Sequence, residues 1–152
     1  MSHQIKPYHG AGVLLFRYNK EKEAFEILLG KRSIRQGYGK WAIPGGGLEK
    51  KDADYRACAF RELWEETGID IKEIETKDLS QTRIDLPFFH WRTFLVMTFG
   101  EIPTFRIREF SELRWIPLNE IRSYDLWISL SRELRLFERL QKPSSSESKS
   151  QT

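Results

Sequence analysis

The segment from Arg61 to Ile69 constrains this chain most, because it carries three carboxylates within five residues. On a helix of 3.6 residues per turn, Glu62, Glu65 and Glu66 fall at about 0°, 300° and 40° around the axis. The nearby apolar residues fall between about 160° and 220° on the same wheel, and these are Ala53, Ala57, Phe60 and Trp64. The pattern predicts an amphipathic helix with an acidic face and an apolar face.

The acidic face calls for a counter-charge, because like charges at this spacing repel one another. A hard divalent cation is the natural one. The helix has boundary signals on both sides: Asp52 or Asp54 can cap its start, and Gly68 can end it in a left-handed conformation. The glycine triplet at 45–47 precedes it and predicts an irregular loop at its N-terminal side.

Composition predicts one globular domain. The chain has 152 residues, of which 39% are hydrophobic and 31% charged. We expect a single domain over residues 1–141 and a disordered tail over 142–152, where no hydrophobic residue occurs. The formal net charge of +3 is too small to indicate a nucleic-acid or membrane surface.

Three features predict a cytoplasmic protein. Cys58 is the one cysteine, so no internal disulfide can form. The first residues lack a charged region followed by an apolar core, and no apolar run approaches the roughly 18 residues that span a bilayer.

The remaining elements suggest an α/β or α+β fold. Apolar runs at 12–16 and 25–29, separated by a polar turn at 19–23, predict a hairpin. Further β-rich pieces occur at 69–74 and 88–99. Pro117 favours the start of a helix, and a C-terminal helix that packs on the core is predicted by one apolar stripe: Leu126, Leu130, Leu134, Phe137 and Leu140.

A resemblance to a known family rests on these residues. Gly47, then Arg61-Glu62-Leu63-x-Glu65-Glu66-x-Gly68-Ile69, resembles the signature G-x5-E-x7-R-E-U-x-E-E-x-G-U of the Nudix hydrolases, in which U is aliphatic. Segments 39–44 and 115–118 are also similar to family positions, so the likeness extends from about Gly10 to Leu118. The first glutamate of the signature is the exception: Ala53 occupies its place, and Asp52 matches only with a one-residue shift.

The resemblance implies a Nudix-type α/β/α sandwich with a mixed sheet, and an enzyme that hydrolyses phosphorus-containing anhydrides. It implies that Glu65 and Glu66 bind metal, and that Glu62 is a metal ligand, the general base, or both. Mg²⁺ is expected, with Mn²⁺ as an alternative, because three carboxylates supply hard oxygen ligands. Gly46 or Gly47 can add a backbone carbonyl, and Arg61 can orient the neighbouring carboxylates.

A later acid often completes such sites, and Glu109 and Glu112 are the candidates, with a slight preference for Glu112. Arg32 and Arg35 are candidates for phosphate binding. Several aromatic residues can stack on a base, and we select Trp41 and Phe89 from a group that also contains Tyr38, Phe88 and Trp91.

The sequence leaves the substrate open among ADP-ribose, nucleotide sugars and nucleoside triphosphates, including oxidised ones. One alternative function is a catalytically weak sensor of the same fold that binds a nucleotide, suggested by Ala53. Another is an RNA 5′-end hydrolase, which the modest net charge supports poorly. We expect no stable nucleic-acid partner and no membrane, and a homodimer is possible.

Overall fold

The computed structural model describes residues 6–102, 107–127 and 130–142. In chain order the elements of these ranges are β1 (Tyr8–Asn19), β2 (Ala24–Arg32), β3 (Trp41–Ala42), β4 (Gly45–Gly47), α1 (Tyr55–Thr67), β5 (Glu75–Leu86), β6 (Phe89–Phe99), β7 (Phe110–Pro117), the 3-10 helix η1 (Leu118–Ser123) and α2 (Ser131–Gln141). No helix in these ranges has the length and apolar character that crossing a membrane requires.

The strands form one mixed sheet in the order β3-β2-β1-β6-β5, with β4 paired to β1 and β7 paired to β2. β1 and β6 run parallel, and the other pairs are antiparallel. The predicted hairpin is confirmed, because β1 pairs with β2 from Phe16 opposite Ile27 to Asn19 opposite Ala24.

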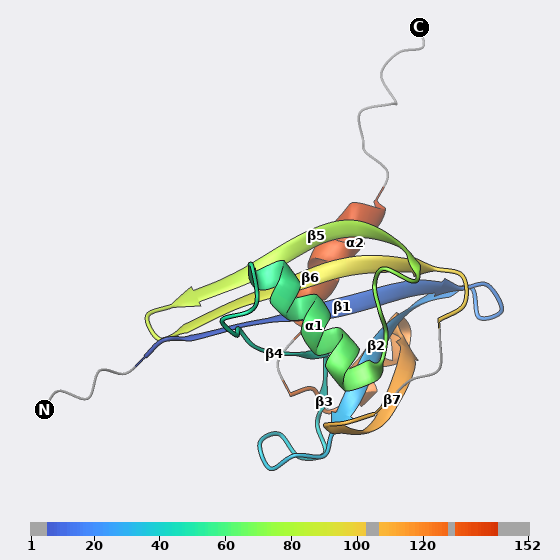
Figure 1. Cartoon of the computed structure of the whole chain (residues 1–152). Helices are drawn as coiled ribbons and strands as arrows, with labels where there is room; N and C mark the ends of the chain where they lie inside the picture. Colours follow the sequence, from blue (N-terminus) through green and yellow to red (C-terminus); the bar gives the residue numbers. More distant parts are fainter. Residues whose placement is uncertain (1–5, 103–106, 128–129, 143–152) are drawn as a thin grey trace, which may run out of the picture.

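Helices cover both faces of the sheet (Figure 1). Alternate residues of β1 point to opposite faces, as strand geometry requires. Val13 and Leu15 pack with Cys58 and Leu63 of α1, whereas Leu14 and Phe16 pack on the other face with a cluster that includes Phe137 of α2. The Phe16 and Phe137 rings stack with their centroids 4.1 Å apart. The predicted α/β/α sandwich is confirmed.

Helix α1 has the predicted ends but not the predicted buried face. Asp54 caps it by accepting a hydrogen bond from the Ala57 N–H at 2.8 Å, and Gly68 ends it at φ 77°. The predicted apolar face is not the side that is buried, because Trp64 is 46% exposed whereas Glu66 of the predicted acidic face is only 4% exposed. The helix packs on the sheet through Cys58, Ala59 and Leu63, whose small or compact side chains allow close approach. Glu66 lies on the same side of the helix and is therefore buried too.

One strand prediction is wrong, and one strand was not predicted. Residues 69–74 form turns and irregular chain, and the strand begins only at Glu75. No apolar run marks β5 as a strand, because its residues are mostly polar and at least partly exposed. The predicted disordered tail lies outside the described residues except for Lys142.

Candidate active site

A cleft of about 640 Å³ opens between the glycine strand β4, the sheet and the start of α2. Glu62 and Glu109 line it together with the three glycines of β4. Its other lining residues include the aromatic residues Tyr8, Phe89, Trp91 and Trp127, and the polar residues Arg32, Thr93, Arg132 and Glu133. The cleft therefore joins an acidic end to an aromatic interior.

Arg61 organises the acidic end. Its Nε and Nη2 atoms donate to the two oxygens of Asp52, each at 2.9 Å. Nη2 also donates to the Gly47 carbonyl at 2.9 Å. Nη1 donates to Glu62 at 3.0 Å and to Glu65 at 3.1 Å. A planar guanidinium with five donors suits this arrangement, and it fixes the helix acids against the glycine strand.

Asp52 fills the place left open by Ala53. Its carboxylate is only 3% exposed, and the hydrogen bonds from Arg61 hold its pKa below the ordinary value. Ala53 itself is exposed. Asp52 therefore gives Arg61 a carboxylate partner despite the one-residue shift.

Glu66 is a buried carboxyl group at the junction of α1 and β4. Its Oε2 accepts a hydrogen bond from the Gly45 N–H at 3.0 Å. Burial raises its pKa to about 9, the Gly45 hydrogen bond opposes that rise, and Glu62 and Glu109 reinforce it. Without a counter-ion, this carboxyl group is protonated at neutral pH.

Glu62 packs closely against the glycine strand. A Cβ atom built on Gly46 would stand 2.5 Å from the Glu62 carboxyl carbon, so only glycine permits this approach. Burial raises the pKa of Glu62, and the contact with Arg61 lowers it less strongly. The carboxylate is therefore partly desolvated at the cleft, as in groups that accept protons during catalysis.

The oxygen donors at this end suit a hard divalent cation by their chemistry. The burial of Glu62 and Glu66, and the repulsion that each of them experiences from Glu109, favour a cation that would neutralise these acids. Within the described ranges, however, no three His, Cys, Asp or Glu side chains are gathered closely enough to form a ready-made metal site. In the structure, Arg61 donates a hydrogen bond to Glu62, and the Gly45 amide donates one to Glu66.

Comparison with known proteins decides the family. A family model described as NUDIX domain matches residues 8–137. The chain belongs to this family. The prediction of a Nudix hydrolase is thereby confirmed.

Two named relatives and one solved structure illustrate the likeness. The chain is 30% identical over 115 residues to an RNA pyrophosphohydrolase of Roseobacter denitrificans, covering 63% of this chain and 71% of the relative. It is 32% identical over 124 residues to a candidate 8-oxo-dGTP diphosphatase 3 of Mycobacterium tuberculosis, covering 78% of this chain and 56% of the relative. The chain thus spans little more than half of the mycobacterial protein.

The solved structure is a bifunctional NMN adenylyltransferase/ADP-ribose pyrophosphatase from Francisella tularensis, in complex with AMP and a Mn ion. It aligns with a TM-score of 0.71 at 20% identity and covers 91% of this chain and 43% of that chain. This likeness supports the Nudix fold.

The structure brings only part of the predicted Nudix site to the cleft. Arg32, Gly46, Gly47, Phe89 and Glu62 line it. Glu65 binds Arg61 instead of lining the cleft, and Arg61 acts by positioning the acids.

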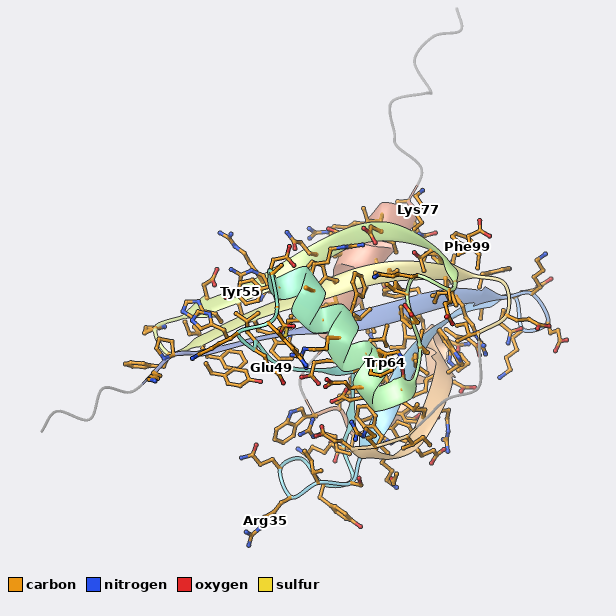
Figure 2. All side chains as sticks on the ribbon, in the orientation of Figure 1. Arg35, Glu49, Tyr55, Trp64, Lys77 and Phe99 are labelled. Carbon is orange, nitrogen blue, oxygen red and sulfur yellow. The ribbon has the colours of Figure 1, made fainter. Side chains whose placement is uncertain are left out.

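Three of the predicted site residues lie elsewhere. Figure 2 shows Arg35 at the tip of the loop between β2 and β3, directed away from the body. Trp41 is only 7% exposed and packs in the core beside Tyr124, so it belongs to the fold and not to the cleft lining. Glu112 pairs with Arg114 on the surface, so of the two candidates for the later acid only Glu109 lines the cleft.

Tyr8, Trp127 and Glu133 also line the cleft, although no sequence pattern pointed to them. Tyr8 is the first residue of β1, and Trp127 lies in the stretch between η1 and α2. Glu133 lies in the first turn of α2. No motif marks them, because they reach the cleft through strand pairing and helix docking.

Proposed function

We propose that this chain is a Mg²⁺-dependent pyrophosphohydrolase, with Mn²⁺ as an alternative cation. Its proposed substrate is a nucleoside diphosphate linked to another moiety: a nucleoside triphosphate, ADP-ribose or a nucleotide sugar. One observation carries the proposal. The buried carboxyl group of Glu66, with a pKa raised to about 9, accepts a hydrogen bond from Gly45 and interacts with Glu62 and Glu109, and these three neighbours line a cleft that also carries aromatic side chains.

The residues proposed to hold the cation are Glu62, Glu66 and Glu109, with the Gly46 carbonyl as a further oxygen ligand. Glu65 is proposed to assist from the outer side, where Arg61 holds it. When bound, the cation neutralises charge on the diphosphate and acidifies water. The Mn ion in the Francisella tularensis protein supports a divalent cation for this fold.

Hydrolysis of the diphosphate then requires a proton acceptor, and Glu62 is proposed for that role. A water oxygen forms a bond to one phosphorus while the bond from that phosphorus to the bridging oxygen breaks. The bridging oxygen leaves with the electron pair on the departing phosphate, and the water proton passes to Glu62. Arg61 positions Glu62 through its 3.0 Å hydrogen bond, and Arg32 is proposed to bind phosphate oxygens from the wall of the cleft.

A second candidate is hydrolysis at the 5′ end of RNA, favoured by the Roseobacter denitrificans relative named RNA pyrophosphohydrolase. The net charge of +3 gives little general attraction for a polynucleotide. The alternative of a nucleotide sensor without catalysis rests mainly on the missing glutamate at position 53. That support weakens, because Asp52 gives Arg61 the carboxylate partner that Ala53 cannot provide. The homodimer and the cytoplasmic location remain predictions from the sequence.

Release of phosphate-bearing products from a substrate panel tests the proposal. The panel contains ADP-ribose, nucleotide sugars, nucleoside triphosphates and 5′-triphosphorylated RNA, each with Mg²⁺ and with chelator. We expect Mg²⁺-dependent turnover of at least one small nucleotide, lost in Glu66→Gln and kept in the exposed control Glu73→Gln. Turnover confined to the RNA would favour the second candidate, and turnover that survives Glu66→Gln would refute the assigned site.

A further inference from the structure

Four neighbouring strands, β4, β1, β6 and β5, form the floor of the cleft. Glycines in β4 and β1 leave space above this floor because they have no side chain. Gly45 of β4 pairs with Gly12 of β1, Gly12 pairs with Thr93 of β6, and Thr93 pairs with Thr82 of β5. Three strand spacings of about 4.8 Å give this row a width of roughly 14 Å. The row leads from the glycine strand beside Glu62 to the first turn of α2.

Beside this row, three stacked aromatic side chains form one wall of the cleft. Trp91 lies over β1, since Cβ atoms built on Gly10 and Gly12 would stand 2.8 Å and 3.0 Å from its ring. Phe89 stacks on Trp91 with centroids 6.3 Å apart and planes 4° apart. Tyr8 stacks on Phe89 with centroids 5.6 Å apart. Flat aromatic faces held in this way can stack on a nucleobase.

Glu133 stands at the α2 end of the cleft with one oxygen unused. Its side chain is buried, with 6% of the residue exposed, and Oε1 accepts a hydrogen bond from the Thr82 hydroxyl at 2.8 Å. Oε2 is shielded from solvent and accepts no hydrogen bond from any described residue. It is the one buried side-chain nitrogen or oxygen in the described ranges without a partner. A buried carboxylate oxygen without a donor is costly, so a ligand that supplies a donor would be favoured there.

Thr93 complements this acceptor with a donor. It is 2% exposed, and its Oγ1 accepts a hydrogen bond from the Trp91 indole N–H at 2.9 Å. The Thr93 hydroxyl donates no hydrogen bond to any described residue, so it can donate to a ligand in the cleft. Thr82 connects the two groups, because it pairs with Thr93 across the strands and donates to Glu133.

We infer that Glu133 and Thr93 read the Watson–Crick edge of a guanine base in the cleft beside Trp91. This inference rests on the proposed function, which puts the phosphates at the Glu62 end. Guanine presents two adjacent N–H donors, at N1 and N2, next to the acceptor O6. The donors match the acceptor-only carboxylate of Glu133, and O6 matches the Thr93 hydroxyl.

The other bases fit this pair less well. Adenine and cytosine each offer one amino donor beside a ring nitrogen acceptor, which would face the carboxylate. Uracil offers one N–H between two carbonyl oxygens. Ribose hydroxyls can also donate to a carboxylate, but they do not use the flat aromatic wall that shares the cleft.

Binding of nucleoside monophosphates tests the inference without requiring turnover. Calorimetric titration of the full chain with GMP, IMP, AMP and UMP compares edges that differ in their donors, since IMP lacks the N2 amino group of GMP. We expect GMP to bind about tenfold to hundredfold more tightly than AMP or UMP, and IMP to fall between GMP and AMP. Equal binding of all four would overturn the inference, even if the chain hydrolyses nucleotides.

Two variants separate base reading from a structural role. Glu133→Gln keeps the side-chain volume but turns one acceptor into a donor, and we expect it to reduce GMP affinity about tenfold or more while AMP affinity changes less than twofold. Glu138→Gln, exposed on the same helix, should leave the GMP preference intact. Should Glu133→Gln fail to fold, Thr93→Val removes the donor and should reduce the same preference. An equal loss for GMP and AMP in a folded variant would refute base reading and indicate ribose binding or a packing role.

The titrations and the substrate panel together distinguish this inference from the proposed function. GMP preference without hydrolysis of any panel substrate would refute the hydrolase and keep the base site. Hydrolysis with no base preference would keep the hydrolase and refute the base site.

Discussion

Asp52 and Arg61 form a two-point ion pair in which both carboxylate oxygens accept hydrogen bonds at 2.9 Å. This pair lies one residue before the position at which the Nudix signature has a glutamate. The carboxylate is only 3% exposed and Arg61 is 12% exposed, so the pair is well shielded from water. It couples the loop before α1 to the acids of the helix.

Replacing Asp52 is therefore expected to destabilise the fold, whereas restoring the motif glutamate at position 53 is not expected to improve turnover. Asp52→Asn should lower the free energy of unfolding by about 3 kcal/mol, because Arg61 loses a buried charged partner. Ala53→Glu should change turnover less than twofold, since position 53 is exposed and Arg61 is already paired. Chemical denaturation and steady-state kinetics measure the two effects. A large activity gain in Ala53→Glu would show that Asp52 does not replace the motif acid.

Glu66 gives the metal-free fold a distinct pH dependence. Its folded pKa is raised from 4.5 to about 9, so the folded chain retains a proton that the unfolded chain releases in this range. Stability contributed by the protonated group is thus present below about pH 4.5 and is lost as pH rises towards 9. We expect the Tm measured with chelator to fall between pH 5 and 9, and to fall less in Glu66→Gln. Parallel curves for the two proteins would contradict the assigned burial effect.

Gly46 and Gly47 provide a matched pair of substitutions. Gly46→Ala would place its methyl group 2.5 Å from the Glu62 carboxyl carbon, so Glu62 must move. A displacement of about 1 Å at a catalytic group can cost about a hundredfold in rate, and we expect kcat to fall by that order. Gly47→Ala meets nothing closer than Tyr8 at 3.6 Å and should retain turnover within a few-fold. Equal losses in both variants would mean that the Glu62 contact does not matter.

Arg32 and Arg35 provide a second pair. Arg32 lines the cleft, donates to the Gln36 carbonyl at 2.9 Å and lies over the Trp127 ring. Arg32→Ala should raise KM about tenfold, because a fixed cation near the phosphates is lost. Arg35→Ala should leave KM unchanged, since that side chain points away from the body. A larger effect at Arg35 would indicate that the loop after β2 folds over the substrate.

Local patterns in the sequence identified the parts of the site that lie close together along the chain. The spacing of Glu62, Glu65 and Glu66 predicted the helix, and Gly68 marked its end because its left-handed conformation favours glycine. The same pattern mispredicted which side of the helix is buried. Periodicity describes the apolar content of a face, but packing against the sheet here used the small side chains of Cys58 and Ala59.

The sequence by itself determined the family motif, the capped acidic helix and the apolar strands of the hairpin, because each depends on residues within a few positions of one another. Only the tertiary structure decided that Asp52 partners Arg61, that Glu109 and not Glu112 lines the cleft, and that Glu133 faces the same cleft as Trp91. These relations depend on strand register and helix docking, which bring distant residues together. Such distances are set by how the whole sheet packs, and no local spacing encodes them.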